Sequence, residues 1–304
     1  MILLLGNYDK NLIDSLPEKY AIRSKSINML ENIVAITEKI KVIVFRSPFV
    51  IDESILRVLP NLKAIIRAGS GIDGIDKQYL EKNNIKLYAT GTYSRSVSEL
   101  ALALFLSAER SIYKLALSIK TGKWEKGSNF GKIITGKRLF VIGLGAIGND
   151  FLNLCQNFNF EILIYDRSPE RKNEVLKKFG AKVVSLNYGF ANADLILVSC
   201  SYNSETHHLV TAKELSNIGS KVTIVNISRG MVFNEKDLMS FLIKNKEIIY
   251  ATDVLHNEPM INREFVALEN VIPLPHVGAQ TYEARKFIDN RVLTILESTC
   301  SKLL

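Results

Sequence analysis

The stretch from residue 138 to residue 150, RLFVIGLGAIGND, decides the fold expected for this 304-residue chain. An apolar run typical of a buried strand leads directly into Gly143, Gly145 and Gly148, which have G-x-G-x-x-G spacing and are expected to open a helix. The first glycine permits a tight turn, the second lets the backbone approach a pyrophosphate, and the third lets helix and strand pack closely. Because a lone G-x-G-x-x-G also occurs in plain turns, the interpretation depends on the surrounding sequence.

Apolar, β-branched runs alternate with longer helix-like segments on both sides of this stretch, which is typical of parallel sheets with crossover helices. The first third of the chain contains four such runs, at residues 2–6, 41–45, 62–67 and 85–89. A second series follows at residues 138–143, 161–166, 181–184, 194–200, 222–228, 248–254 and 271–274. The pattern predicts an α/β protein with two doubly wound parallel-sheet domains, the larger being a Rossmann dinucleotide-binding domain.

Two segments connect the two series of strands. Residues 96–119 have the pattern of one long helix, which Glu109 and Arg110 interrupt too soon for a membrane span. Residues 122–137 are rich in glycine and lysine, so we expect them to form a surface connection.

The residues after the second strand of the larger series bear on the cofactor. Asp166 lies 18 residues beyond Gly148, where an acid accepts hydrogen bonds from an adenosine ribose and repels the extra phosphate of NADP. Arg167 and Ser168 come next, and such a pair is able to hold a 2′-phosphate. The sequence therefore favours NAD and leaves NADP open.

Composition excludes several classes of protein. Hydrophobic residues make up 47% and charged residues 23% of the chain, as in globular proteins. The net charge of +8 is scattered among acids, with no dense basic block, so we expect no nucleic-acid partner. The chain shows no signal peptide and no apolar run of membrane-spanning length, and Cys155, Cys200 and Cys300 have neither metal nor disulfide spacing. We expect a cytoplasmic protein without a metal or a membrane partner.

Three ionisable residues follow strands of the larger series. Arg229, Glu258 and His276 come after the runs at 222–228, 248–254 and 271–274, so they are expected at one edge of one sheet. Singly, each has an ordinary structural explanation. Together they suit hydride transfer between an alcohol and a carbonyl: a histidine moves the hydroxyl proton, a carboxylate stabilises its protonated form, and a guanidinium binds a substrate carboxylate.

Several motifs in a fixed order identify the chain as resembling the D-isomer-specific 2-hydroxyacid dehydrogenase family over nearly its whole length. They begin with RAGSGIDGID (67–76), SVSELALALFL (96–106), GKW (122–124) and GLGAIG (143–148). They continue with YD (165–166), NISRGMVFNEKDL (226–238), DVLHNEP (253–259) and PHVGAQT (275–281).

The resemblance implies roles for individual residues. Arg229, Glu258 and His276 match the catalytic set of the family, and the backbone of Ser70 and Gly71 matches its site for the substrate carboxylate. The implied cofactor-binding positions are Gly143, Gly145, Ala146, Ile147, Gly148, Asp166, Arg167, Ser199, Cys200 and Asp253. Of these, Asp253 is expected on the nicotinamide side and Ser199 and Cys200 near the adenine, where the family often has a histidine and a proline instead.

The resemblance also implies a domain organisation. Residues 1–98 and 282–304 are expected to form a discontinuous substrate domain, and residues 99–281 the NAD-binding domain. Dimers in this family usually form through the nucleotide-binding domain, so we expect a homodimer.

Within the family, VFRSP (44–48) and IIRAGSGID (65–73) most resemble phosphoglycerate dehydrogenases, in which arginines at the positions of Arg46 and Arg67 lie near the substrate phosphate. This favours D-3-phosphoglycerate as the substrate, and with it a role in serine biosynthesis. The alternative is that these arginines form surface salt bridges and have a structural role. Two further functions stay open, a hydroxypyruvate or glyoxylate reductase and a non-catalytic, NAD-binding co-repressor.

Overall fold

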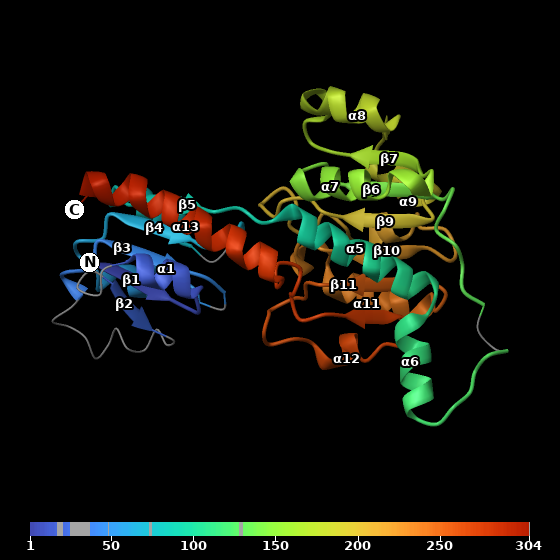
Figure 1. The fold of residues 1–304 in the computed structure, drawn as a ribbon. Coiled ribbons are helices and arrows are strands. Elements are labelled where there is room, and N and C mark those ends of the chain that lie inside the picture. The colour runs from blue at the N-terminus through green and yellow to red at the C-terminus, as the bar shows by residue number, and fades with distance from the viewer. Residues whose placement is uncertain (17–20, 25–36, 48, 73–74, 128–129, 304) are drawn as a thin grey trace. The chain divides into compact units, whose positions relative to one another are not determined.

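The computed structural model describes residues 1–16, 21–24, 37–47, 49–72, 75–127 and 130–303. The chain divides into two compact units, Met1–Tyr93 with Ala279–Leu304, and Ser94–Gly278 (Figure 1). Each unit is built around one parallel β-sheet covered by helices. The α/β class with two parallel-sheet domains is therefore confirmed.

The first unit contains a five-stranded sheet in the order β2-β1-β3-β4-β5. Its strands, β1 to β5, are Ile2–Leu5, Ala21–Ser24, Val42–Phe45, Ala64–Arg67 and Lys86–Ala89. The sequence predicts four of them and misses β2, because its residues, AIRS, contain no apolar run. All residues of β1 and β3 are buried, as expected for central strands of a parallel sheet.

Helices cover both faces of this sheet. Helix α13, Tyr282–Leu303, places Ile288, Val292 and Leu296 on one side at intervals of four residues, in the same core cluster as Leu12 of helix α1, Lys10–Ser15. On the other face, α3 (Glu53–Arg57) and α4 (Lys77–Lys82) each bury a leucine against the strands. Alternate strand residues supply the two cores: Ile2, Leu4, Val42 and Val44 on the α13 side, and Leu3, Leu5, Ile43 and Phe45 opposite.

The second unit contains a seven-stranded sheet in the order β12-β11-β10-β9-β6-β7-β8. Strands β6 to β12 are Arg138–Ile142, Glu161–Tyr165, Lys182–Val183, Leu195–Val198, Thr223–Asn226, Ile249–Thr252 and Val271–Pro273. All seven predicted strands are present. From β6 the chain winds outward to β8, returns to β9 beside β6, and then continues to β12. A doubly wound sheet binds its ligands where the strand order reverses, which here is at β6 and β9.

Two layers of helices enclose the second sheet. On one face, α5 (Ser94–Glu109) and α7 (Ala146–Leu154) pack together, with the rings of Phe105 and Phe151 5.7 Å apart. The other face packs against α9 (Leu186–Asn192), α10 (Ala212–Leu215), α11 (Glu235–Lys244) and α12 (Arg263–Val266). Helix α8 (Asn173–Phe179) follows β7 and ends at Gly180, which adopts a left-handed conformation.

The long helix predicted over residues 96–119 is wrong, because two helices occupy this region. Helix α5 ends at Glu109, and α6 spans Ile112–Lys120. Ser111, between them, has a φ of 50° in the left-handed region, which no α-helix continues through. The segment that follows, up to β6, contains no regular element among its described residues, as expected for a surface connection. Across the part of the chain that the structure describes, no helix is both long and apolar enough to cross a membrane.

Candidate active site

The carboxyl ends of the central strands of the second sheet lie in register. Ile142 of β6 pairs with Val198 of β9, which pairs with Asn226 of β10, and Asn226 pairs with Thr252 of β11. Because all strands are parallel, the loops that follow them leave from one edge of the sheet. The sequence-predicted residues on these loops therefore share that edge: Gly143, Asp166, Ser199, Arg229, Asp253, Glu258 and His276.

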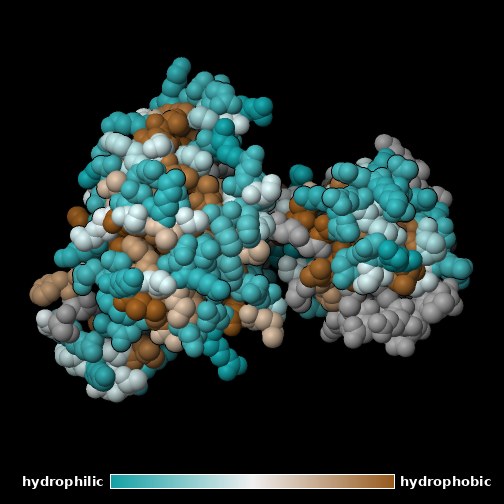
Figure 2. Space-filling model, turned by 180° about the vertical axis from the view of Figure 1, so that it is seen from behind, coloured by the Kyte–Doolittle hydropathy of each residue, from teal (hydrophilic) through white to brown (hydrophobic). Residues whose placement is uncertain are grey.

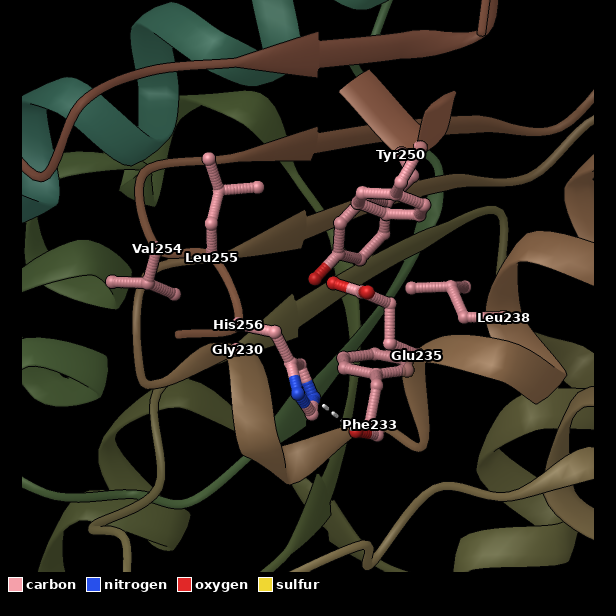
Figure 3. A pocket seen from close by; sticks show the side chains of 9 residues that line it. Gly230, Phe233, Glu235, Leu238, Tyr250, Val254, Leu255 and His256 are labelled. Atoms are coloured by element: carbon pink, nitrogen blue, oxygen red, sulfur yellow. Dashed lines mark hydrogen bonds between the residues drawn. The ribbon is translucent and has the colours of Figure 1, made fainter. Parts of the chain in front are cut away.

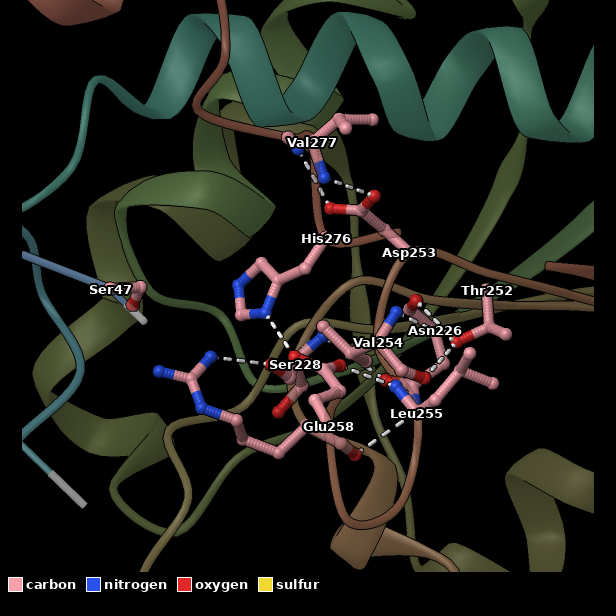
Figure 4. Close-up of polar contacts among 12 residues, drawn as sticks. Ser47, Asn226, Ser228, Thr252, Asp253, Val254, Leu255, Glu258, His276 and Val277 are labelled. Carbon is pink, nitrogen blue, oxygen red and sulfur yellow. Dashed lines mark hydrogen bonds and ion pairs between the residues drawn. The ribbon is translucent and has the colours of Figure 1, made fainter. Parts of the chain in front are cut away.

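The histidine and the glutamate predicted to act together are in direct contact. Nδ1 of His276 lies 2.7 Å from Oε2 of Glu258, and both side chains are partly exposed, at 43% and 32% (Figure 4). The other carboxylate oxygen of Glu258 accepts a hydrogen bond of 2.6 Å from the backbone N–H of Leu255. Burial opposes ionisation of Glu258, but the bonds from His276 and Leu255 and the nearby charge of Arg229 outweigh it, so its pKa lies below the ordinary value.

Asp253 holds the loop that carries His276. Its side chain is buried and accepts hydrogen bonds from the backbone N–H groups of Val277, at 2.7 Å, and Gly278, at 2.8 Å. Burial raises its pKa, and these two bonds partly offset that effect. A Cβ at Gly278 would lie 2.9 Å from Oδ2 of Asp253, so a larger residue there would have to displace this carboxylate. Asp253 is expected near the nicotinamide, and both of its carboxylate oxygens thus accept hydrogen bonds from the backbone that follows His276.

Arg229 follows a turn that a buried amide organises. Asn226, fully buried at the end of β10, accepts from the N–H of Ser228 at 3.0 Å and donates to the carbonyl of Arg229 at 3.1 Å. Its amide also donates to the hydroxyl of Tyr250 at 2.9 Å. The guanidinium of Arg229 donates to the carbonyl of Ser228 at 2.6 Å. The positioning roles of Asn226 and Tyr250 depend on contacts between strands, which the sequence does not reveal.

The loops that carry Arg229 and Glu258 touch each other through their backbones. A Cβ at Gly230 would lie 2.3 Å from the carbonyl carbon of Leu255, so only glycine fits there. Beside this contact, Nε2 of His256 lies 2.9 Å from the carbonyl oxygen of Phe233. Behind it is a small pocket lined by residues of both loops together with the side chains of Tyr250, Leu238 and Glu235 (Figure 3). This packing fixes the two loops relative to each other.

The glycine motif has the geometry that a dinucleotide requires. Gly143 has a φ of 92°, and a Cβ there would lie 2.4 Å from the Cα of Cys200. Nothing lies within 4 Å of a Cβ at Gly145, so the space beside it is open. Helix α7 begins there without a side-chain cap, which leaves the N–H groups of Ala146 and Ile147 in its first turn to a ligand. A pyrophosphate fits this arrangement.

The third glycine and the loop after β9 both pack against the turn at Gly143. A Cβ at Gly148 would lie 2.8 Å from the carbonyl oxygen of Gly143, so helix and turn pack too closely for any other residue. The hydroxyl of Ser199 donates to the same carbonyl oxygen at 2.7 Å. Ser199 therefore supports the turn at Gly143 from the neighbouring strand.

Asp166 stands directly after β7, as the sequence predicts. Its two carboxylate oxygens accept from the N–H groups of Leu144, at 2.8 Å, and Ser168, at 2.9 Å. The carboxylate is thereby held beside the glycine turn. The next residue, Arg167, forms an ion pair with Glu205, which no sequence pattern singles out.

In the first unit, the two arginines expected near a phosphate have partners inside that unit. Arg46 follows β3, is 8% exposed and forms an ion pair with Asp289 of α13, with its guanidinium 4.3 Å from the centre of the Tyr8 ring. Arg67, at the end of β4, donates to the carbonyls of Gly71, at 3.0 Å, and Ala68, at 3.2 Å.

The guanidinium of Arg67 also donates to the hydroxyl of Ser47 at 2.7 Å. Its three bonds therefore connect the end of β4, the end of β3 and the loop that contains Ser70 and Gly71. Ser70 is exposed and Gly71 is partly exposed on this loop. The arrangement makes Arg67 a support for the loop.

Comparison with known proteins agrees with this geometry. The family model described as "D-isomer specific 2-hydroxyacid dehydrogenase, NAD binding domain" matches residues 102–278. A hydroxypyruvate reductase of Thermotoga maritima is 33% identical over 261 residues, which cover 84% of this chain and 83% of that protein. A D-3-phosphoglycerate dehydrogenase of Methanocaldococcus jannaschii is 35% identical over 254 residues, covering 82% of this chain and 48% of that protein. The chain thus spans about half the length of the second relative.

Solved structures show the same fold. A glyoxylate reductase from Paecilomyes thermophila has a TM-score of 0.84 and 25% identity, covering 99% of this chain and 95% of its own. A D-lactate dehydrogenase from Aquifex aeolicus, complexed with NAD and lactic acid, has a TM-score of 0.85 at 21% identity, covering 99% of this chain and 96% of its own.

Proposed function

The chain belongs to the D-isomer specific 2-hydroxyacid dehydrogenase family and is an NAD-dependent oxidoreductase, and from this premise we propose that it interconverts a small D-2-hydroxy acid and its 2-keto acid. One observation carries the proposal: the hydrogen-bonded pair of His276 and Glu258, on the sheet edge that also presents Arg229 and the glycine motif. An acid/base histidine oriented by a carboxylate is what alcohol oxidation and carbonyl reduction require.

His276 is the proton carrier in this proposal. Its Nδ1 faces the carboxylate of Glu258, which leaves Nε2 as the nitrogen that gives a proton to the substrate carbonyl oxygen or takes one from the hydroxyl. The ionised Glu258 stabilises the imidazolium form that reduction needs. Asp253 keeps the backbone after His276 in place. The nicotinamide supplies the hydride in reduction and accepts it in oxidation.

Arg229 is the electrophilic residue in this proposal. A guanidinium binds a carboxylate through paired N–H groups and polarises a carbonyl next to it. The buried amide of Asn226 fixes the turn on which Arg229 lies. In the first unit, we assign substrate binding to the backbone of Ser70 and Gly71, on the loop that Arg67 supports. The first unit then serves as the substrate domain and the second as the NAD-binding domain.

An unphosphorylated keto acid, with hydroxypyruvate or glyoxylate as the leading candidates, fits the first unit better than phosphohydroxypyruvate does. A phosphate needs cations whose charge and N–H groups are not already engaged. The charge of Arg46 is balanced by Asp289, and N–H groups of Arg67 already donate to two carbonyls and a hydroxyl of its own unit, although these neutral partners do not balance its charge. Phosphoglycerate is the second candidate, supported by the residue types at positions 46 and 67 and by the 35% identical relative.

A panel of keto acids tests this proposal. We expect oxidation of NADH, followed spectrophotometrically, with hydroxypyruvate, glyoxylate or pyruvate. The value of kcat/KM for phosphohydroxypyruvate should be at least about ten times lower, because one charge-assisted contact to the phosphate is missing. A preference for phosphohydroxypyruvate would favour the phosphoglycerate dehydrogenase candidate. Absence of turnover with every acid of the panel, in a protein that still binds NADH, would favour a non-catalytic binding function.

We also propose that two copies of the chain associate through α6 and the segment after it. This region exposes Ile112, Tyr113, Leu117, Ile119, Trp124, Phe130 and Ile133, each by more than half. In the space-filling view, apolar patches interrupt the hydrophilic surface of the larger unit (Figure 2). Light scattering is expected to give a dimer for the parent and a monomer after Leu117→Glu with Ile119→Glu. Ile243→Glu, at an isoleucine of α11 that is nearly as exposed, should leave the dimer intact.

A further inference from the structure

An ion pair spans the end of strand β6, where the glycine turn begins. Arg167 follows β7, and Glu205 lies on the loop after β9. The sheet order places β6 between β9 and β7, so this pair joins the loops on either side of β6. The two residues are 38 positions apart in the sequence, and both side chains are partly exposed, at 52% for Arg167 and 64% for Glu205. The pair thus lies at the adenosine end of a dinucleotide site.

The loop that carries Glu205 is held by its own side chains. The amide oxygen of Asn203 accepts from the N–H groups of Glu205, at 2.9 Å, and Thr206, at 3.2 Å. The hydroxyl of Thr206, which is buried, donates to the carbonyl of Ser201 at 2.8 Å. Glu205 therefore projects from a fixed turn, and only its side chain has to be ordered when it pairs with Arg167.

The charges around Arg167 oppose binding of a second phosphate group at the ribose. Arg167 lies between two acids, Asp166 before it in the sequence and Glu205 across β6, so the three side chains together carry a net charge of −1. The N–H of Ser168 is also engaged, because it donates to Asp166. A guanidinium and a backbone N–H that could bind a 2′-phosphate thus already bind carboxylates.

We propose that Glu205 is a specificity-determining residue of this chain, which excludes NADP by pairing with Arg167 and neutralising the cation that its 2′-phosphate would otherwise bind. NAD presents hydroxyl groups at this position, and these require the carboxylate of Asp166 and no cation. A 2′-phosphate would have to displace Glu205 from Arg167 and then lie beside two carboxylates. The sequence RS at 167–168, which by itself suits NADP, is compatible with NAD because of a residue from another loop.

Binding of the two reduced cofactors to the protein without substrate tests the proposal, with isothermal titration calorimetry as the readout. Glu205→Gln is expected to lower the dissociation constant of NADPH about fivefold, the usual upper limit for an exposed charge pair, and to change that of NADH less than twofold. Glu161→Gln is the matched control, because Glu161 pairs with Lys182 near the amino end of β7, on the opposite edge of the sheet. This control should leave both dissociation constants unchanged.

A second pair of variants separates Arg167 from the charge of Glu205 alone. Arg167→Ala in the parent should barely change NADPH binding, because the arginine is already neutralised. In the Glu205→Gln background, Arg167→Ala should abolish the gain in NADPH affinity. A gain that persists without Arg167, or a Glu205→Gln protein that binds NADPH no better than the control does, overturns the proposal. Circular dichroism and the melting temperature of each variant verify that it is folded.

The test is independent of the substrate assigned above, since no keto acid is present. Raising the salt concentration supplies a further readout. The difference in NADPH affinity between Glu205→Gln and the parent should shrink at about 1 M salt, where the Debye length falls to about 3 Å. An affinity difference that salt leaves unchanged would mean that the effect is not electrostatic and would overturn the proposed cause.

Discussion

At the carboxyl edge of the five-stranded sheet, Arg46 is buried in an ion pair, whereas at the carboxyl edge of the seven-stranded sheet, His276 and Glu258 pair while both stay partly exposed. Both sets of residues follow parallel strands, so the rule that places ligands beyond strand ends selects them equally. The difference is exposure: the side chains of Arg46 and Asp289 are 10% and 3% exposed, whereas those of His276 and Glu258 are 43% and 32% exposed. A paired charge at a strand end is thus a site candidate when the pair stays accessible to a ligand, and a structural pair when it is buried.

The largest effect is expected at the exposed pair of the second sheet. His276→Asn should lower kcat for keto-acid reduction by about 10²–10⁴, the usual worth of a positioned acid/base, while the dissociation constant of NADH stays the same. His207→Asn is the control, because the contacts described for the His207 side chain are with Tyr202 and His208. An unchanged kcat in the His276 variant would show that His276 is not the acid/base, and the exposed pair would then be no more catalytic than the buried pair of the first sheet.

The next effect is on stability, at the buried pair of the first sheet. Asp289→Asn should lower the free energy of unfolding by about 3–5 kcal/mol, because it leaves the charge of Arg46 buried without its counter-ion. Glu53→Gln removes an acid from an exposed pair with Arg57 in the same unit and should cost only about 0.5 kcal/mol. Urea titrations measure both. If Asp289→Asn were as mild as its control and improved turnover of phosphohydroxypyruvate, Arg46 would be a substrate ligand.

A smaller effect is expected at Arg67, whose bonds support the loop of Ser70 and Gly71. Arg67→Ala should lower kcat/KM for hydroxypyruvate and for phosphohydroxypyruvate together, by about tenfold, which corresponds to about 1.4 kcal/mol, the net worth of the one hydrogen bond that reaches Gly71. Arg57→Ala, at an exposed arginine of the same unit, is the control. A loss confined to the phosphorylated substrate would contradict the supporting role and place Arg67 at the phosphate.

The smallest effect is a shift in the pH profile. Glu258 has a pKa below its ordinary value, so it is ionised at neutral pH and favours protonated His276. Glu258→Gln should therefore move the pH profile of reduction to lower pH, because the carboxylate beside the proton donor is lost. Steady-state rates between pH 5 and pH 9 would show the shift, and an upward shift would contradict the pairing.

The same carboxylate makes a prediction about acid stability with a defined sign. A carboxyl group whose pKa is depressed by folding contributes stability above its unfolded pKa and loses it as the pH falls through its folded pKa. Glu258→Gln should therefore destabilise the protein at neutral pH and make its unfolding free energy less sensitive to acidification below about pH 4.3, the ordinary glutamate value.

The sequence predicted the strands and the site edge because these depend on local patterns. Apolar runs of strand length and turn glycines are properties of neighbouring residues, so all seven strands of the larger sheet were predictable. Strand β2 was not, because its AIRS sequence lacks that pattern and pairing with β1 alone defines it. The break at Ser111 was also missed, since the apolar pattern continues across it.

The sequence by itself determined which residues stand at the carboxyl ends of strands, including Gly143, Asp166 and His276, because parallel strands place their following residues at one edge. Tertiary structure alone decided which charges are balanced there. Arg46 meets Asp289 across 243 positions, and Arg167 meets Glu205 across 38. The physical reason is that a charge is neutralised by whichever group folding brings within a few ångströms, and no local pattern encodes that distance.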